Sequence, residues 1–285
     1  MSERNLMKSS ANTVPAVKEE GWWETVKVIV QALLIALVVR TALFQPFNIP
    51  SGSMEATLLI GDYLFVEKFA YGYSQYSFPW GLGPISGRVW AGNGPQRGDV
   101  IVFKLPRSGH VDYIKRLVGL PGDRIQVRAG RLYINDKPVG VTFEKTVNVD
   151  DRLIPEQAAW VRETNPEGRR YLTQIHGQGA EGADNTGVYQ VPPHCYFMMG
   201  DNRENSLDSR FDPGVPPEDP KLGACGWDSR LDAYLPPEAG VGFVPEENLV
   251  GRAEIVLLSW KQGASIFKPW TWLNLRGDRV FRRVT

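Results

Sequence analysis

A serine-containing turn directly follows the most apolar stretch of the chain. Residues 50–54 read PSGSM, so Ser51 and Ser53 flank a glycine. Proline and glycine fix a tight turn and let the backbone approach a ligand closely, a setting in which a serine hydroxyl could do nucleophilic chemistry. Taken alone the segment also fits an ordinary turn, and it lacks the GxSxG spacing of a hydrolase elbow.

A lysine in an alternating segment is the second candidate for chemistry. Residues 112–116 read DYIKR. In a strand, Tyr113 and Lys115 would share one face, while Ile114 and Arg116 would share the other. A neutral lysine could act as a base. The alternative, which is the usual place of a strand lysine, is a solvated position on an edge strand.

A dense polar loop is the third candidate. Residues 200–210 read GDNRENSLDSR and hold five ionisable groups, directly after the apolar residues 196–199. Charged loops usually lie on the surface. This loop follows a strand that should be buried, so we expect its polar groups to form an internal network.

Together these segments resemble the type I signal peptidase (leader peptidase) family of bacteria. The resemblance is carried, in order, by PSGSMEATLLIGDYLFVEKFAYG (50–72), RGDVIVF (97–103), DYIKRLVGLPGD (112–123), GDNRENSLDSR (200–210) and GFVPEENLVGRA (242–253). Residues 137–187 hold no motif that aligns, and the loop 212–241 is longer than the family pattern.

The resemblance implies peptide-bond hydrolysis through an acyl-enzyme, with Ser53 as nucleophile and Lys115 as general base. Serine attacks poorly unless a neighbour takes its proton, and no histidine lies in any of these motifs. A lysine with the reference pKa of about 10.4 is well under about 1% neutral at pH 7. Burial against apolar walls must therefore lower the pKa of Lys115 by about two to three units.

The resemblance also implies supporting roles. Ser206 is expected to hydrogen-bond and orient the lysine, and the Ser51 hydroxyl is expected to form the oxyanion hole with the backbone N–H of Ser53. We expect a structural ion-pair network of Arg116, Asp201, Asp208 and Arg210. Two shallow pockets that read an A-x-A pattern would be lined by Phe47, Ile49, Met54, Leu58, Leu64, Tyr113 and Ile114, for which the alternative is plain core.

The apolar stretch before the serine turn reads as a membrane anchor. Residues 28–44 read VIVQALLIALVVRTALF, and we place the transmembrane helix at 25–44 after a polar tail at 1–24. A cleavable signal peptide is one alternative, but no clean small-x-small site follows. A buried helix of a soluble protein is the other, and Trp22, Trp23 and the flanking bases disfavour it.

The charges around this stretch predict its orientation. Basic residues precede the span at Arg4, Lys8, Lys18 and Lys27, whereas Arg40 is the only one close behind. The positive-inside rule places the N-terminus in the cytoplasm. We therefore expect a single-pass protein of the bacterial inner membrane with a periplasmic catalytic domain at 45–285.

Beyond the anchor the pattern has period two, which predicts a mainly β fold: an antiparallel catalytic core with an inserted β-rich subdomain at about 130–188. Strands are expected at 62–69, 98–105, 112–120, 123–135 and 252–260, with a hairpin turn at 128–131. Residues 137–187 lose the alternation and look irregular. The segment 212–241 is rich in proline and glycine and reads as a long surface loop.

Composition excludes some classes of function. The formal net charge is +0, which argues against a nucleic-acid partner. The three histidines are scattered and no CxxC occurs, so we expect no metal, and the proposed chemistry needs no cofactor. The expected partners are preprotein substrates and the lipid bilayer, and we expect a monomer. Two rivals stay open: a self-cleaving repressor of related fold, and a catalytically dead, membrane-tethered binding module.

The two cysteines, Cys195 and Cys225, both fall in the part expected outside the membrane, where disulfides persist. We predict that they form a disulfide which pins the long loop beside the active site. The alternative is two unpaired thiols, with Cys195 buried and Cys225 exposed.

Overall fold

The structure is a computed structural model that describes residues 21–78, 83–89, 92, 94–106, 108–149, 156–176, 183–211, 225–226, 240–261, 263–264 and 268–285. The chain divides into two compact units, residues 1–38 and residues 39–285. Nearly all of the predicted tail 1–24, and most of the predicted loop 212–241, lie outside the described residues.

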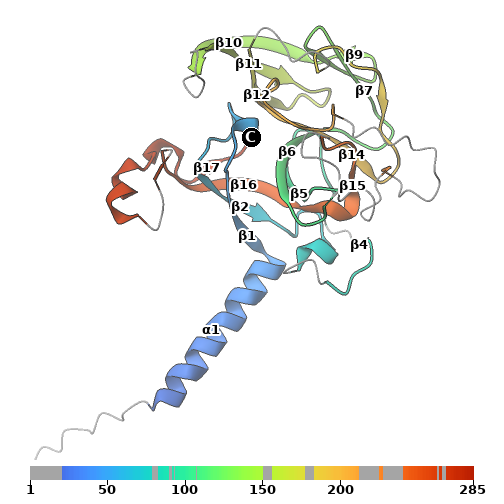
Figure 1. Cartoon of the computed structure of the whole chain (residues 1–285). Helices are drawn as coiled ribbons and strands as arrows, with labels where there is room; N and C mark the ends of the chain where they lie inside the picture. Colours follow the sequence, from blue (N-terminus) through green and yellow to red (C-terminus); the bar gives the residue numbers. More distant parts are fainter. Residues whose placement is uncertain are drawn as a thin grey trace, which may run out of the picture. The chain divides into compact units, whose positions relative to one another are not determined.

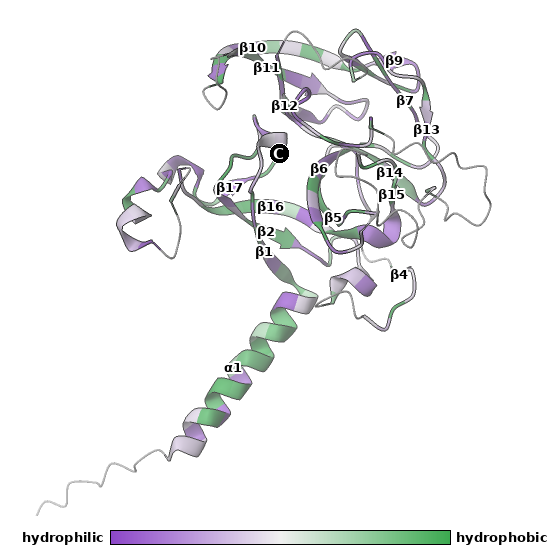
Figure 2. Cartoon of the chain, viewed as in Figure 1, coloured by the Kyte–Doolittle hydropathy of each residue, from purple (hydrophilic) through white to green (hydrophobic). Residues whose placement is uncertain are grey.

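One long helix, α1 (Trp22–Ala42), contains the apolar stretch. It holds no glycine or proline, none of its side chains is buried, and Figure 2 shows apolar residues along most of its length. Twenty-one residues at 1.5 Å each span about 30 Å, the thickness of a bilayer core. Among the described residues it is the one helix long and apolar enough to cross a membrane.

The boundaries of this helix differ from the predicted span 25–44. The helix starts three residues earlier, and Phe44 already belongs to the first strand. Pro46 gives the physical reason for the earlier end of the helix, because proline cannot continue a helix and it disfavours the α conformation in the residue before it.

The main sheet has eight strands, and all of its pairings are antiparallel (Figure 1). The strand order is β1-β2-β16-β5-β6-β14-β15, and β17 also pairs with β16. The bounds are β1 (Phe44–Asn48), β2 (Asp62–Glu67), β5 (Val100–Lys104), β6 (Asp112–Gly119), β14 (Cys195–Met199), β15 (Val244–Pro245), β16 (Leu249–Ser259) and β17 (Arg282–Arg283). The predicted mainly β, antiparallel core is confirmed.

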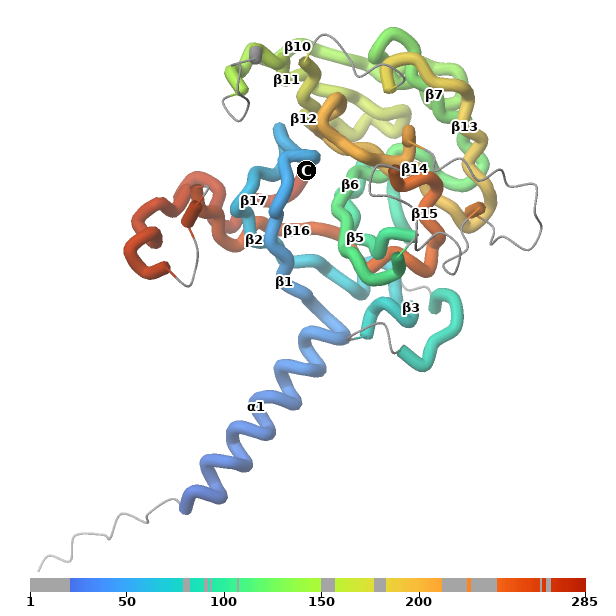
Figure 3. Tube along the Cα trace, viewed as in Figure 1, coloured from blue at the N-terminus to red at the C-terminus, as the bar shows by residue number. Residues whose placement is uncertain are grey.

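Burial explains which strands alternate. In β2 every second residue is buried, so the strand shows the period of two that the sequence displays. In β14 all five residues are buried, so the strand is a continuous apolar run. Figure 3 shows β14 beside β6, although the two are far apart in the sequence, and this pairing brings the polar loop after Met199 close to Lys115.

Smaller sheets surround the main one. Their orders are β10-β11-β12, β13-β7-β8-β9 and β3-β4. Their bounds are β3 (Tyr73–Ser74), β4 (Arg88–Val89), β7 (Arg124–Arg128), β8 (Arg131–Ile134), β9 (Lys137–Pro138), β10 (Gly140–Val149), β11 (Glu156–Thr164), β12 (Arg170–Ile175) and β13 (Tyr189–Gln190). Short 3-10 helices are η1 (Gly52–Met54), η2 (Gln75–Ser77), η6 (Glu246–Asn248), η7 (Pro269–Asn274) and η8 (Gly277–Arg279).

Two local predictions can be compared with these sheets. The predicted turn at 128–131 joins β7 to β8, and its central residues Ala129 and Gly130 have φ of 47° and 73°, as a type I′ turn requires. The predicted inserted β-rich subdomain is confirmed, because β10, β11 and β12 form an antiparallel sheet, whereas the prediction that 137–187 is irregular is wrong. Most residues of β10 are exposed on both faces, so no alternation between core and solvent marks the strand.

Cys195 and Cys225 form a disulfide whose Cα atoms are 5.7 Å apart. Both residues are buried, and they belong to one apolar cluster with residues of β7, β8 and β14. The structure therefore pairs the two cysteines, and it attaches residue 225 to the first residue of β14, at the opposite end of that strand from the polar loop.

Candidate active site

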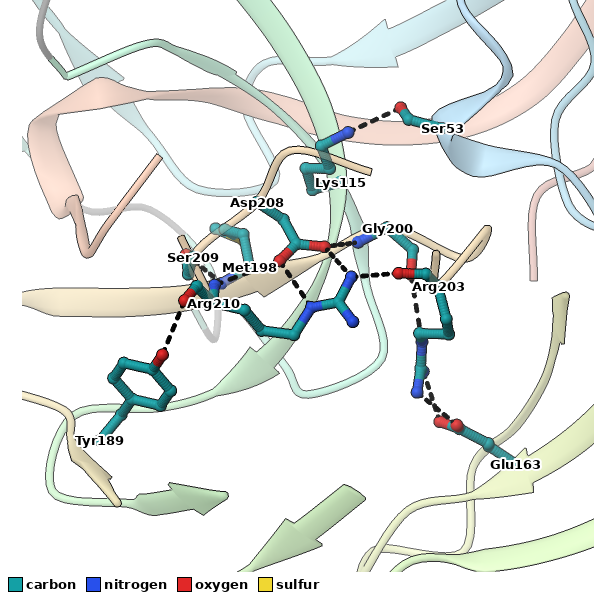
Figure 4. A network of polar contacts seen from close by, with 10 residues as sticks. All are labelled: Ser53, Lys115, Glu163, Tyr189, Met198, Gly200, Arg203, Asp208, Ser209 and Arg210. Atoms are coloured by element: carbon teal, nitrogen blue, oxygen red, sulfur yellow. Dashed lines mark hydrogen bonds and ion pairs between the residues drawn. The ribbon is translucent and has the colours of Figure 1, made fainter. Parts of the chain in front are cut away.

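Ser53 and Lys115 lie in direct contact although they are 62 residues apart. The Lys115 Nζ atom donates to the Ser53 Oγ atom at 2.6 Å (Figure 4). Ser53 is in the short helix η1, which buried Met54 holds against the core. Lys115 is in β6, which is exposed at its first residue and buried from Lys115 onward. The two predicted segments therefore deliver one hydroxyl and one amine to the same point.

Lys115 is a buried residue, not the solvated edge-strand lysine of the alternative reading. Its exposed fraction is 3%, and β6 lies between β5 and β14 in the sheet. Burial lowers the pKa of Lys115 to about 8, an effect that Asp208 opposes and that Arg210 reinforces. With that pKa, roughly one amine in ten is neutral at pH 7. A neutral amine can accept the serine proton across the same 2.6 Å contact.

A cleft opens around this pair. Its lining includes Ser51, Ser53, Lys115 and Ser206, together with Pro50, Gly52, Val111, Asp112, Tyr113, Ile114, Glu204, Asn205, Leu207 and Phe211. The structure thus brings together residues from three sequence motifs. Among the described residues, no three His, Cys, Asp or Glu side chains are grouped to hold a metal ion.

The predicted apolar pocket residues divide into two groups. Tyr113 and Ile114 line the cleft. Ile49, Met54, Leu58 and Leu64 are instead buried together in one core cluster, and Phe47 packs partly against another. The structure therefore does not bring these five to the wall of the cleft. Val111, Leu207 and Phe211 supply apolar lining that the sequence analysis missed.

Ser51 lies beside the proposed nucleophile. Its Oγ atom is 3.5 Å from the Ser53 Oγ atom, and the residue is exposed in the cleft. This position is compatible with a hydroxyl that faces a bound carbonyl group next to Ser53.

Ser206 lies in the cleft but does not make the predicted contact. Its Oγ atom is buried and makes no hydrogen bond to the residues that the structure describes, so the expected bond to the Lys115 amine is not formed here. Gly200 packs directly against this serine. A Cβ atom on Gly200 would fall 2.2 Å from the Ser206 Oγ atom and 2.6 Å from the Ser53 carbonyl oxygen.

We therefore expect Gly200→Ala to lower the rate of substrate cleavage by about 100-fold, since an added methyl group must displace both serines and a displacement of about 1 Å can cost that much. Cleavage assays on the purified variant check this. Gly187→Ala is the control, because a Cβ atom there would meet nothing within 4 Å. Near-normal cleavage by Gly200→Ala would contradict the close packing described here.

The four predicted network residues form two buried ion pairs. Arg116 donates through Nε and Nη2 to the two carboxylate oxygens of Asp201, at 2.7 Å each. Arg210 donates to both oxygens of Asp208 at 2.9 Å. Burial alone would raise the pKa of Asp208, but the charge and hydrogen bonds of Arg210 outweigh it and hold that pKa below its usual value. The Asp208 carboxylate therefore stays charged near Lys115.

Two further residues of the site escaped the sequence analysis. Asn202 holds the serine turn through two hydrogen bonds. Its backbone N–H donates to the Ser53 carbonyl oxygen at 3.1 Å, and its side-chain amide donates to the Gly52 carbonyl oxygen at 3.2 Å. Glu163 in β11 pairs with Arg203 of the polar loop. The motif that contains Asn202 offered a signal for it, whereas Glu163 lies in the stretch without a recognisable pattern.

Comparison with known proteins decides the family. A family model described as signal peptidase, peptidase S26, matches residues 22–260. The chain belongs to the signal peptidase family. Signal peptidase I of Rickettsia typhi is 36% identical over 270 residues, which cover 88% of this chain and 90% of that protein. Signal peptidase I of Rickettsia akari is 34% identical over 297 residues, which cover 97% of this chain and 96% of that protein.

A solved structure is also similar to the chain. It is a signal peptidase I from Enterococcus faecalis, 24% identical, which matches 56% of this chain and 97% of its own, with a TM-score of 0.27. Membership of the signal peptidase family confirms the resemblance seen in the motifs and makes the chain a peptidase. With helix α1, it also makes the chain a membrane-anchored protein.

Proposed function

We propose that this chain cleaves N-terminal signal peptides from secreted preproteins, with Ser53 as nucleophile and Lys115 as general base. Membership of the signal peptidase family supports signal-peptide cleavage by a membrane-associated peptidase. The observation that supports the residue roles is the 2.6 Å contact between the Ser53 Oγ atom and the buried amine of Lys115. Burial favours the neutral amine, which is the form that can act as a base.

The proposed reaction uses the cleft in two steps. Neutral Lys115 takes the Ser53 proton as the Oγ atom attacks the carbonyl carbon of the scissile bond, and the protonated amine then gives that proton to the leaving nitrogen. The Ser51 hydroxyl and the Ser53 N–H stabilise the oxyanion. In the second step Lys115 takes a proton from water as that water attacks the acyl carbonyl carbon, and the protonated amine returns the proton to the Ser53 Oγ atom as its bond to the acyl group breaks.

The proposed substrates carry small residues before the cut. Tyr113 and Ile114 line the cleft beside Lys115, and shallow apolar walls accept small side chains at an A-x-A site. Purified full-length protein in detergent should cut a preprotein after alanine, with the new N-terminus read by mass spectrometry. Tryptophan at either alanine position should block cleavage, and Ser53→Ala protein is the control. Cleavage that ignores these positions would contradict the proposal.

The same preparation separates the rival functions. A self-cleaving protein would cut itself and leave the preprotein intact. A binding module would retain the preprotein without cutting it.

We also propose that the body of the protein lies on the periplasmic side of the bacterial inner membrane. Lys27 lies near the start of the helix and Arg40 in its last turn, and more basic residues precede the helix than follow it closely. Protease added to spheroplasts should digest a tag after Thr285 and spare a tag at the N-terminus. Digestion of the N-terminal tag instead would show the opposite topology.

A further inference from the structure

A buried ion pair joins the sheet β10-β11-β12 to the polar loop of the active site. The two guanidinium nitrogens Nη1 and Nη2 of Arg203 donate to the two carboxylate oxygens of Glu163 at 2.5 and 2.6 Å. Each side chain is only 5% exposed. Other ionisable groups that face Arg203 are Tyr171 and Asp201. A charge this deeply buried needs a partner, so Glu163 largely fixes where Arg203 can lie.

Arg203 in turn ties together both ends of the polar loop. Its Nε atom donates to the carbonyl oxygen of Gly200 at 3.1 Å, and its own carbonyl oxygen accepts from the Nη2 atom of Arg210 at 2.5 Å. Arg210 pairs with Asp208, which also accepts from the Gly200 N–H at 2.9 Å. Figure 4 shows this chain of contacts running from Glu163 to Asp208, next to Lys115.

This series of contacts ends beside the Lys115 amine, which contacts Ser53. The charged groups that act on Lys115 are Asp208, Arg210 and Asp201, and the ring of Tyr113 lies 5.7 Å from its Nζ atom. The position of Asp208 and Arg210, and the exclusion of water by the loop, together set how readily this amine gives up its proton.

A backbone contact places the same sheet against the same loop. The N–H of Gln174, in β12, donates to the carbonyl oxygen of Asp201 at 2.7 Å. The N–H of Arg203 donates to the carbonyl oxygen of Gln174 at 2.9 Å. The inserted sheet is therefore docked on the loop, and Glu163 is its buried charged contact.

We propose that Glu163 is a positioning residue for the reaction: through Arg203 it holds the polar loop, with Asp208 and Arg210, against Lys115. This inference rests on the proposed role of Lys115 as general base. Glu163 itself touches neither the serine nor the lysine in the contacts described, so it acts through the loop and not on the substrate.

The test is the pH dependence of cleavage by full-length Glu163→Gln protein in detergent. Without the carboxylate the loop loosens and water reaches Lys115, so burial lowers the pKa of Lys115 less than in the wild-type protein. The acidic limb of the pH–rate profile then moves to higher pH by about one unit. Cleavage below the limb should therefore fall about tenfold, while kcat above the limb and KM stay near the wild-type values. Glu163→Asp, which keeps the charge, should restore most of the wild-type profile.

Two further variants separate positioning from simple loss of stability. Asp123→Asn breaks another buried pair, with Arg97, that lies outside the polar loop, so it should lower the melting temperature and leave the limb in place. If Glu163→Gln protein does not fold, the double variant Glu163→Gln/Arg203→Met removes both charges and is measured instead, with the same shift expected.

The outcomes distinguish this inference from the proposed function. A folded variant whose limb stays in place, or moves to lower pH, overturns the role of Glu163 and leaves the role of Lys115 intact. Wild-type protein without an acidic limb, or near-normal cleavage by Lys115→Ala, overturns the proposed function itself.

Discussion

Ser53→Ala and Lys115→Ala are each expected to lower preprotein cleavage by about 10⁵–10⁶-fold while the protein stays folded. Ser53 supplies the attacking oxygen, and Lys115 is the one amine in contact with it among the described residues. Because nucleophile and base act as one unit, the double variant should lose little more than either single variant.

Rates from single-turnover cleavage, with thermal unfolding of each variant, check this. Lys137→Ala is the control, because it removes an exposed lysine in β9, outside the motifs, and should cleave normally. If Lys115→Ala kept near-normal turnover at pH 8, Lys115 would not be the base. If the double variant lost the product of the two single effects, the two residues would act separately.

The second large effect is on both activity and stability, and it follows from the pKa of Lys115, which burial lowers from 10.5 to about 8. Only the neutral amine acts as a base, so cleavage should fall about tenfold for each pH unit below 8 and level off above it. A rate that is flat from pH 5 to pH 9 would rule out lysine as the base.

The same lowered pKa makes Lys115 unfavourable for folding. Below pH 8 the amine is protonated in both states, so the folded state carries the full cost of burying the charge, about 3 kcal/mol for a shift from 10.5 to about 8. Between pH 8 and 10.5 the unfolded state binds more protons, so the free energy of unfolding rises with pH and the cost disappears above 10.5.

Lys115→Met should therefore raise the free energy of unfolding by up to about 3 kcal/mol at pH 7, and by much less at pH 10. Urea denaturation at the two pH values measures this difference. Lys137→Met should change little at either pH, because that lysine is exposed. An equal gain at both values, or a loss at pH 7, would show that burial does not cost Lys115 its charge.

The sequence predicted the strands whose buried side chains are apolar and missed those that are exposed or that bury polar side chains. Alternation marks β2, and a continuous apolar run marks β14, because their side chains face a core. Most of β10 faces solvent on both sides, and the buried positions of β11 and β12 include the polar residues Glu163, Thr173 and Gln174, so this sheet left no comparable apolar pattern. That sheet carries Glu163, whose partner Arg203 lies 40 residues away in the polar loop, and no local signal predicts such a pair.

The site was predictable where the residue type itself limits the chemistry. A serine and a lysine in ordered motifs, with no histidine among them, leave few ways to activate a hydroxyl. The apolar lining was less predictable, since alternation shows that Leu64 and its neighbours share a face but not whether that face meets the core or the cleft. The geometry of Ser206 depends on its packing against Gly200, which no spacing reveals.

NMR titration of full-length protein labelled with ¹³C and ¹⁵N in its lysines measures whether Lys115 is a buried amine with a lowered pKa. The Lys115 signal is identified by its absence in Lys115→Met. We expect a midpoint at about pH 8. A midpoint near the ordinary lysine value of about 10.4 would contradict it.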